Sequence, residues 1–219
     1  MYRIALIQNK SNMFHQSYAD NRGMIEEMDI DYNLYTSSNI EELQDDIEKN
    51  TIDCIVLTSN SLNDKKIFEY VYNSTFKEQL EKYLDKGKGL IILHQIKLSK
   101  QNTLYDFIPA KYGTIGPIKR EDDNMNGNYH VDEFYENHPL LVFPSKVDLK
   151  KVEADARHSK NIPGLYWHYL NVGNSLWEKV IVDSESNNSL LVKSKNANII
   201  VTSLLLDWQK QFDLMHNVI

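Results

Sequence analysis

The 219-residue chain has one cysteine, Cys54, so it cannot form an intramolecular disulfide bond. Such scarcity of cysteine is typical of a reducing compartment. The first residues, MYRIALIQNK, lack the apolar stretch of a secretory signal peptide, and no apolar run approaches the roughly 20 residues needed to cross a bilayer. We therefore expect a cytoplasmic protein that does not associate with a membrane.

Positive charge is also in short supply. The 24 Lys and Arg residues stand against 31 Asp and Glu residues, which gives a net charge of −7. Because nucleic-acid-binding proteins usually carry a basic stripe, we expect no general nucleic-acid binding. Metal-binding patterns such as HExxH and CxxC are absent, and candidate ligands such as His130 and Asp132 are better interpreted as solvated loop residues. We expect no metal site, and the sequence identifies no cofactor. Lys far outnumbers Arg, and Asn and Ile are frequent, which suggests an AT-rich, bacterial genome.

Strand and helix patterns alternate through the first half of the chain. Short apolar runs predict buried strands at Arg3–Gln8, Asp31–Tyr35, Asp53–Thr58 and Leu90–Leu93. Amphipathic spacing predicts helices over Met13–Met28, Ile40–Lys49 and Phe68–Lys86. This alternation implies right-handed βαβ units and a parallel sheet covered on both faces. We predict the order 2-1-3-4 for the first four strands.

The second half has a different pattern. Gln101–Asn137 is polar and is interpreted as an irregular insertion rather than a linker. Shorter strands are expected at Tyr166–Tyr169, Lys179–Asp183, Leu190–Lys193 and Ile199–Leu204. Turn residues at Glu185–Ser189 and Ser194–Ala197 predict antiparallel hairpins. Gln209–Ile219 has loose helical spacing without a capping signal, so we expect one domain over residues 1–219 that forms the N-terminal part of a longer protein.

Three motifs resemble a known superfamily. FKEQLEKYLDKGKGLIILHQ (Phe76–Gln95) is similar to the helix, turn and strand before the nucleophile of class I glutamine amidotransferase-like domains, in particular of the ThuA-like branch. Glu136–Leu140 resembles the His-Pro-Ile motif of that branch, and the segment from Trp177 to Trp208 resembles its final hairpin. The resemblance implies a three-layer, flavodoxin-like α/β domain with a mostly parallel central sheet and a C-terminal antiparallel hairpin.

The catalytic residues of that superfamily are missing. A working glutaminase carries a cysteine on a sharp bend after this strand, but here the bend reads Leu93-His94-Gln95. Cys54 lies inside a predicted strand and is interpreted as a core residue. The late His-x-Glu pattern is absent as well. We therefore expect no glutaminase activity and assign no catalytic residue.

Neutral polar side chains follow several of the predicted strands. They are Asn9, Ser59, Asn60, His94 and Gln95, and the ThuA-like resemblance adds His138. Because ligands of open α/β sheets bind outside the carboxyl ends of the strands, these residues are candidates for binding a polar small molecule. The alternative is that they cap helices and satisfy turns. If these residues bind a ligand, we expect His94 to be a rim residue that fills little core volume.

Three functions remain open. The first is a non-catalytic domain that binds a ligand or assembles with other domains of a larger protein. The second is a ThuA-like sugar-binding or sugar-processing protein, and the third is a small hydrolase with an unidentified nucleophile. The apolar segment Phe212–Ile219 and the aromatic run Tyr166–Tyr169 also suggest contact with a second copy or with other domains.

Overall fold

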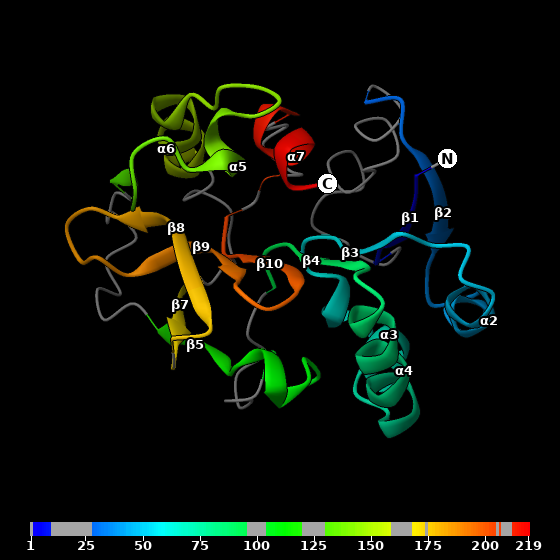
Figure 1. Ribbon diagram of the computed structural model, residues 1–219. Helices are drawn as coiled ribbons and strands as arrows, with labels where there is room; N and C mark the ends of the chain where they lie inside the picture. Colours follow the sequence, from blue (N-terminus) through cyan, green and yellow to red (C-terminus); the bar gives the residue numbers. More distant parts are fainter. Residues whose placement is uncertain are drawn as a thin grey trace.

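The computed structural model describes residues 2–9, 28–95, 104–119, 130–158, 168–173, 175–204, 206 and 212–219 (Figure 1). One mixed sheet joins its strands in the order β2-β1-β3-β4-β10-β9-β7-β5, while β8 pairs with β9 and with β6. The strands are β1 (Arg3–Ile7), β2 (Asp31–Tyr35), β3 (Cys54–Leu57), β4 (Gly89–Ile92), β5 (Ile115–Lys119), β6 (Val131–Glu133), β7 (His168–Val172), β8 (Trp177–Asp183), β9 (Ser189–Ser194) and β10 (Asn198–Thr202).

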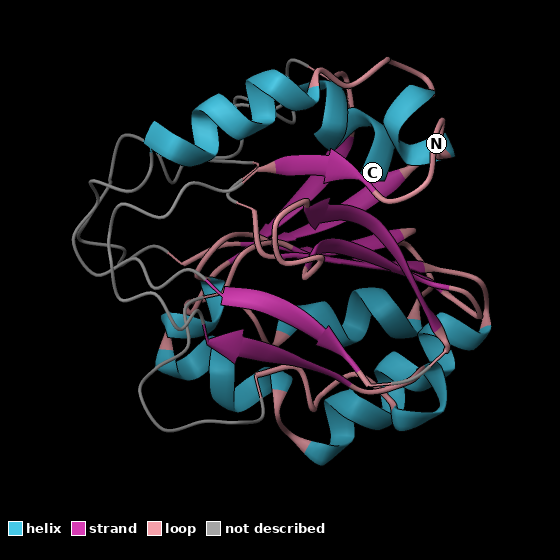
Figure 2. Cartoon of the chain, turned by 90° about the vertical axis from the view of Figure 1, so that its left-hand side faces the viewer, coloured by secondary structure: helices cyan, strands magenta, loops and turns pink. Residues whose placement is uncertain are grey.

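The helices cover both faces of this sheet (Figure 2). They are α2 (Glu42–Glu48), α3 (Lys65–Val71), α4 (Ser74–Asp85), α5 (Pro139–Val142), α6 (Leu149–His158) and α7 (Phe212–Val218), with short 3-10 turns at Ser61–Asn63 and Ala110–Tyr112. One apolar core lies under α2, α3 and α4, and a second lies under α5, α6 and α7. The expected three-layer α/β fold is therefore confirmed. No helix in the described part of the chain is long and apolar enough to span a membrane.

The parallel half of the sheet has the predicted order. β1 pairs in parallel with β2 and β3, β3 pairs with β4, and β4 continues in parallel to β10. Every residue of β3 is buried, as expected for a strand covered on both faces. On α4 the predicted face is buried through Phe76, Leu80, Tyr83 and Leu84. The predicted helix at Met13–Met28 lies outside the described residues, apart from Met28 itself.

The C-terminal half is antiparallel, as the turn residues predicted. β8 pairs with β9, and β9 pairs with β10. Two short strands, β5 and β6, occur where we expected an irregular insertion. β5 contains Gly116 and Pro117, which sequence rules disfavour in a strand, but it lies at the edge of the sheet, where proline is tolerated.

The aromatic run and the final apolar segment pack inside this chain. In β7, His168 and Tyr169 are buried, and Tyr166 and Trp167 lie outside the described residues. In α7, Leu214, Met215 and Val218 join the second core. These side chains therefore do not form the exposed patch on which the expectation of self-association was based.

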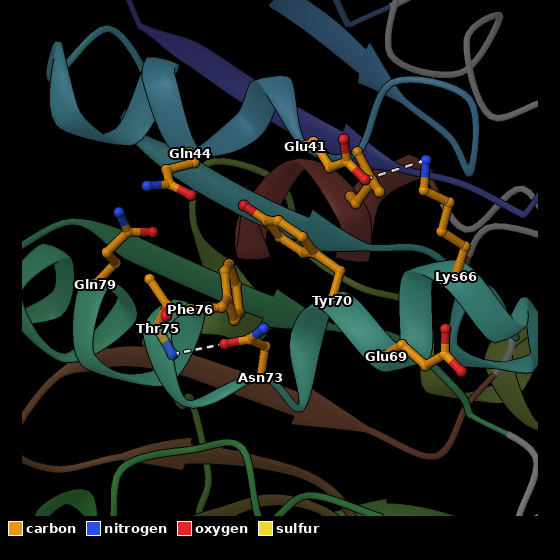
Figure 3. Close-up of a pocket in the computed structure, with 10 residues that line it drawn as sticks. Glu41, Gln44, Lys66, Glu69, Tyr70, Asn73, Thr75, Phe76 and Gln79 are labelled. Carbon is orange, nitrogen blue, oxygen red and sulfur yellow. Dashed lines mark hydrogen bonds and ion pairs between the residues drawn. The ribbon is translucent and has the colours of Figure 1, made fainter.

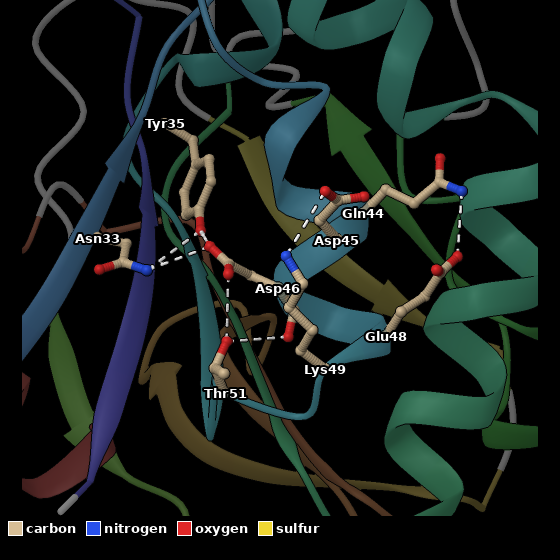
Figure 4. A network of polar contacts seen from close by, with 8 residues as sticks. All are labelled: Asn33, Tyr35, Gln44, Asp45, Asp46, Glu48, Lys49 and Thr51. Atoms are coloured by element: carbon tan, nitrogen blue, oxygen red, sulfur yellow. Dashed lines mark hydrogen bonds and ion pairs between the residues drawn. The ribbon is translucent and has the colours of Figure 1, made fainter.

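A polar network fixes α2 against β2 (Figure 4). The Tyr35 hydroxyl, at the end of β2, donates to the carboxylate of Asp46 on α2. Asn33 Nδ2 donates to the same carboxylate at 3.2 Å, and Thr51 Oγ1 donates to it at 3.3 Å. Burial, and then the hydrogen bond to Asp46, raise the pKa of Tyr35. The network holds the edge strand in place beside the helix that covers it.

Candidate functional site

The ends of β1, β3 and β4 meet at one edge of the sheet. Thr58, directly after β3, donates from both its main-chain nitrogen and its hydroxyl to Ile7 O at the end of β1, at 3.0 and 2.8 Å. Leu93 N, directly after β4, donates to Leu57 O at 2.9 Å. The carboxyl edge, where this class of fold binds ligands, is therefore built from short turns that hydrogen-bond to one another.

The side chain of Gln95 crosses these turns. Its Nε2 donates to Thr58 O at 2.8 Å and to Leu93 O at 3.0 Å, and its Oε1 accepts from Leu62 N at 3.0 Å. The residue is fully buried. Gln95 therefore holds together main-chain groups that would otherwise be desolvated without these partners.

Asn60 forms the turn after β3. Its φ of 60° lies in the left-handed region, which asparagine adopts more readily than most residues, and its main-chain nitrogen donates to His94 O at 2.8 Å. Ser59 precedes it, and Asn9 follows β1 at the same edge; all three are buried. The structure thus gathers five of the six candidate residues at the carboxyl edge: Asn9, Ser59, Asn60, His94 and Gln95.

His94 does not lie at a rim. It is fully buried, and its Nδ1 lies 2.7 Å from Ser203 O. Because a carbonyl oxygen can only accept, Nδ1 carries the proton and Nε2 presents a lone pair. Burial lowers the pKa of His94 to about 4, while the bond to Ser203 opposes this shift, so the ring is neutral at pH 7. The expectation of a rim residue was wrong, because Ser203 after β10 and His168 on β7, both from the C-terminal half, pack against the imidazole.

Sequence reasoning missed His168, which lies beside His94, and Tyr105, which contacts His168. The ring of His168, on β7, lies 5.3 Å from the His94 ring between centroids, and Tyr105 OH lies 3.0 Å from His168 Nε2. Both are buried. The period-2 pattern of the aromatic run could have placed His168 on one face of its strand, but no signal marked Tyr105 within a segment interpreted as irregular.

His138 lies elsewhere. It caps α5, where its Nδ1 accepts from Leu140 N at 3.2 Å, and its Nε2 lies 3.6 Å from Glu178 Oε1 on β8. Strand register places Glu178 in the same row as Ile91, three strands away from β4. Three steps of about 4.8 Å between neighbouring strands place the backbones of Glu178 and Ile91 roughly 14 Å apart. His138 and His94 therefore do not share one site.

Cys54 and the metal-binding residue types are the other candidates for a reactive centre. Cys54 is buried in the middle of the sheet, and burial raises the pKa of its thiol to about 12. No cluster of three His, Cys, Asp or Glu side chains suited to a metal ion occurs among the residues described above. What the carboxyl edge offers chemically is a set of neutral donors and acceptors.

No protein-family model and no curated protein matches this sequence. Solved structures do match. A glutamine amidotransferase from Thermotoga maritima has a TM-score of 0.55 at 11% identity, over 94% of this chain and 76% of that one. A ThuA-like protein from Bacteroides uniformis has a TM-score of 0.54 at 13% identity, over 98% and 89%. The N-terminal domain of mmIFT52 has a TM-score of 0.51 at 11% identity, over 98% and 94%. At such identities the likeness is one of fold.

Proposed function

Starting from the class I glutamine amidotransferase-like fold of this chain, we propose that it is a non-catalytic domain used for ligand binding or for assembly within a larger protein. The observation that carries the proposal is His94. It follows β4, where the superfamily resemblance places the nucleophile, and its protonated Nδ1 already donates a hydrogen bond to Ser203 O. An imidazole held inside the sheet in this way acts as a brace.

The chemistry of glutamine hydrolysis supports the same reading. The reaction needs a nucleophile that attacks the amide carbon and later leaves, together with a general base. His94 cannot form a thioester, and the thiol of Cys54 is buried with its pKa raised to about 12. The five residues directly after β10, Ser203-Leu204-Leu205-Leu206-Asp207, include no histidine that could act as the base.

Ligand binding and assembly rest on separate observations. Binding draws support from the position of Asn9, Ser59 and Asn60 at the carboxyl edge, since His94 and Gln95 there already bond main-chain groups. Assembly draws support from the exposed apolar residues Val142 and Phe143 at the end of α5, and from the likeness to a structure described as an N-terminal domain. Self-association and contact with other domains of the same protein stay predictions.

A ThuA-like sugar-binding protein is the second candidate. The fold neighbour from Bacteroides uniformis and the histidine after β4 favour it. The distance between His94 and His138 counts against a sugar site that uses both, because the strand register separates them by three strands.

Ammonia release from glutamine tests the first proposal. We expect none from the purified protein above the rate of a buffer blank. Release that is abolished by Cys54→Ala would show that the chain is a glutaminase. A rise in Tm with a monosaccharide, retained in His138→Ala and lost in a folded His94→Asn variant, would favour the sugar-binding candidate.

A further inference from the structure

A polar pocket lies in the helical layer formed by α2, α3 and α4. It has a volume of about 380 Å³ and is formed between the beginning of α2, the middle of α3 and the first turns of α4 (Figure 3). This volume falls within the range of small-ligand sites. None of the five residues gathered at the carboxyl edge lines it.

Acceptor oxygens face into this pocket. Glu48 Oε1 accepts from Gln44 Nε2 at 3.1 Å and from Gln79 Nε2 at 2.8 Å, so the amide oxygens of both glutamines point away from Glu48. Figure 3 shows these oxygens on the side that faces the Tyr70 hydroxyl. Gln79 Oε1 and the hydroxyl of Tyr70 are both shielded from solvent and have no hydrogen-bond partner among the described residues. Buried polar atoms of this kind call for a ligand or a water molecule.

The field in the pocket is negative. Burial raises the pKa of Tyr70, and the nearby carboxylates of Glu41 and Glu48 raise it further. Glu41 and Glu69 line the mouth beside one ammonium group, that of Lys66, which lies 3.3 Å from Glu41 Oε1. The first turn of α4 also reaches the pocket, but the Asn73 side chain accepts from Thr75 N at 2.8 Å and caps it.

We propose that this pocket binds an alkylguanidinium group, such as the side chain of arginine. A guanidinium has five donors and no acceptor. It therefore matches the acceptor oxygens of Gln44, Gln79 and Tyr70, which approach the pocket from different directions. Its planar face can stack on an aromatic ring, and Tyr70 lines the pocket beside Phe76, with ring centroids 5.0 Å apart. Lys66 is the resident cation, and the incoming guanidinium competes with it for Glu41.

Titration of the whole chain with N-acetyl-arginine methylamide, followed by NMR of the backbone amides, tests this proposal. The citrulline analogue is the matched probe, because it keeps the shape and loses the charge. We expect shifts confined to α2, α3 and the first turns of α4, with the citrulline analogue bound roughly tenfold more weakly or not at all. Equal binding of both analogues, or no shifts with the arginine analogue, would overturn the proposal.

Three variants locate the binding. Glu41→Gln and Tyr70→Phe should weaken it several-fold, whereas Lys66→Met should strengthen it by removing the competing cation. Glu78→Gln is the matched control, since it removes a carboxylate from α4 outside the pocket. If Glu41→Gln and Glu78→Gln had equal effects, the loss of binding would reflect net charge alone, and the site would be refuted.

Two forms of the probe distinguish the source of the guanidinium. Tighter binding of free arginine than of the capped form would indicate a small-molecule ligand. Tighter binding of the capped form would indicate an arginine side chain of a protein partner.

Discussion

The imidazole of His94 donates from Nδ1 to the main-chain oxygen of Ser203 at 2.7 Å. His94 follows β4 and Ser203 follows β10, two strands that lie side by side in parallel. The bond therefore ties the carboxyl ends of these two strands together. Because both residues are buried, we interpret His94 as a structural brace.

Removal of this brace should destabilise the protein. His94→Ala leaves a cavity and deprives Ser203 O of its donor, so we expect a loss of about 2–5 kcal/mol in the free energy of unfolding. His94→Asn should lose less, because an asparagine amide can donate as Nδ1 does. Urea denaturation monitored by circular dichroism measures both. A His94→Ala variant as stable as the wild type would restore the rim interpretation.

The same residue should make stability depend on pH. Burial lowers the pKa of His94 from its ordinary value of 6.5 to about 4. Between these values the unfolded chain binds a proton that the folded chain does not, so stability is full above pH 6.5 and falls as the pH approaches 4. The slope is at most about 1.4 kcal/mol per pH unit. The fall should be shallower in His94→Asn, and parallel curves for the two proteins would contradict the assignment.

Local patterns were enough to predict the parallel half of the fold. The apolar runs that became β1, β3 and β4 are short, continuous and separated by helical spacing, so one window of sequence identifies each. The burial of His94 is different, because it depends on Ser203 and His168, which lie far away in the chain. His138 was grouped with His94 by a motif, yet its side chain caps a helix, which depends on where α5 begins. β5 was missed because Gly116 and Pro117 argue against a strand. They are tolerated only because β5 lies at the edge of the sheet, which the sequence does not reveal.

Gln95 should be intolerant of an apolar replacement. Gln95→Leu deprives Leu62 N, Thr58 O and Leu93 O of their partner, and each buried group left in this way costs about 1–3 kcal/mol. We expect a loss of roughly 3 kcal/mol or more in urea denaturation. Gln44→Leu, at a partly exposed position, is the control and should change stability by no more than about 0.5 kcal/mol. Equal effects of the two substitutions would argue against a bracing role.

The thiol of Cys54 should be unreactive in the folded protein. Burial, with a smaller contribution from Asp53, raises its pKa to about 12, so on the order of one molecule in 10⁴ carries a thiolate at pH 8. We expect no reaction with Ellman's reagent under native conditions and one equivalent in urea. Cys54→Ala gives the background signal. Stoichiometric labelling of the native protein within minutes would show that the thiol is accessible.

Gly89 and Cys54 should be coupled across β3 and β4, where they lie opposite one another. A Cβ atom added at Gly89 would lie 2.9 Å from Cys54 Sγ and 3.3 Å from Cys54 Cβ, closer than van der Waals contact allows. Gly89→Ala should therefore cost about 1–3 kcal/mol by overpacking. The cost should shrink in a Cys54→Ala background, because the closest atom is gone while the Cβ contact remains, and a coupling energy of at least about 0.5 kcal/mol is expected.

Gly116→Ala, where an added Cβ meets nothing within 4 Å, controls for the intrinsic change from glycine to alanine. Denaturation midpoints of the four proteins of the cycle measure the coupling, and an equal cost of Gly89→Ala in both backgrounds would show that the thiol does not require a glycine there.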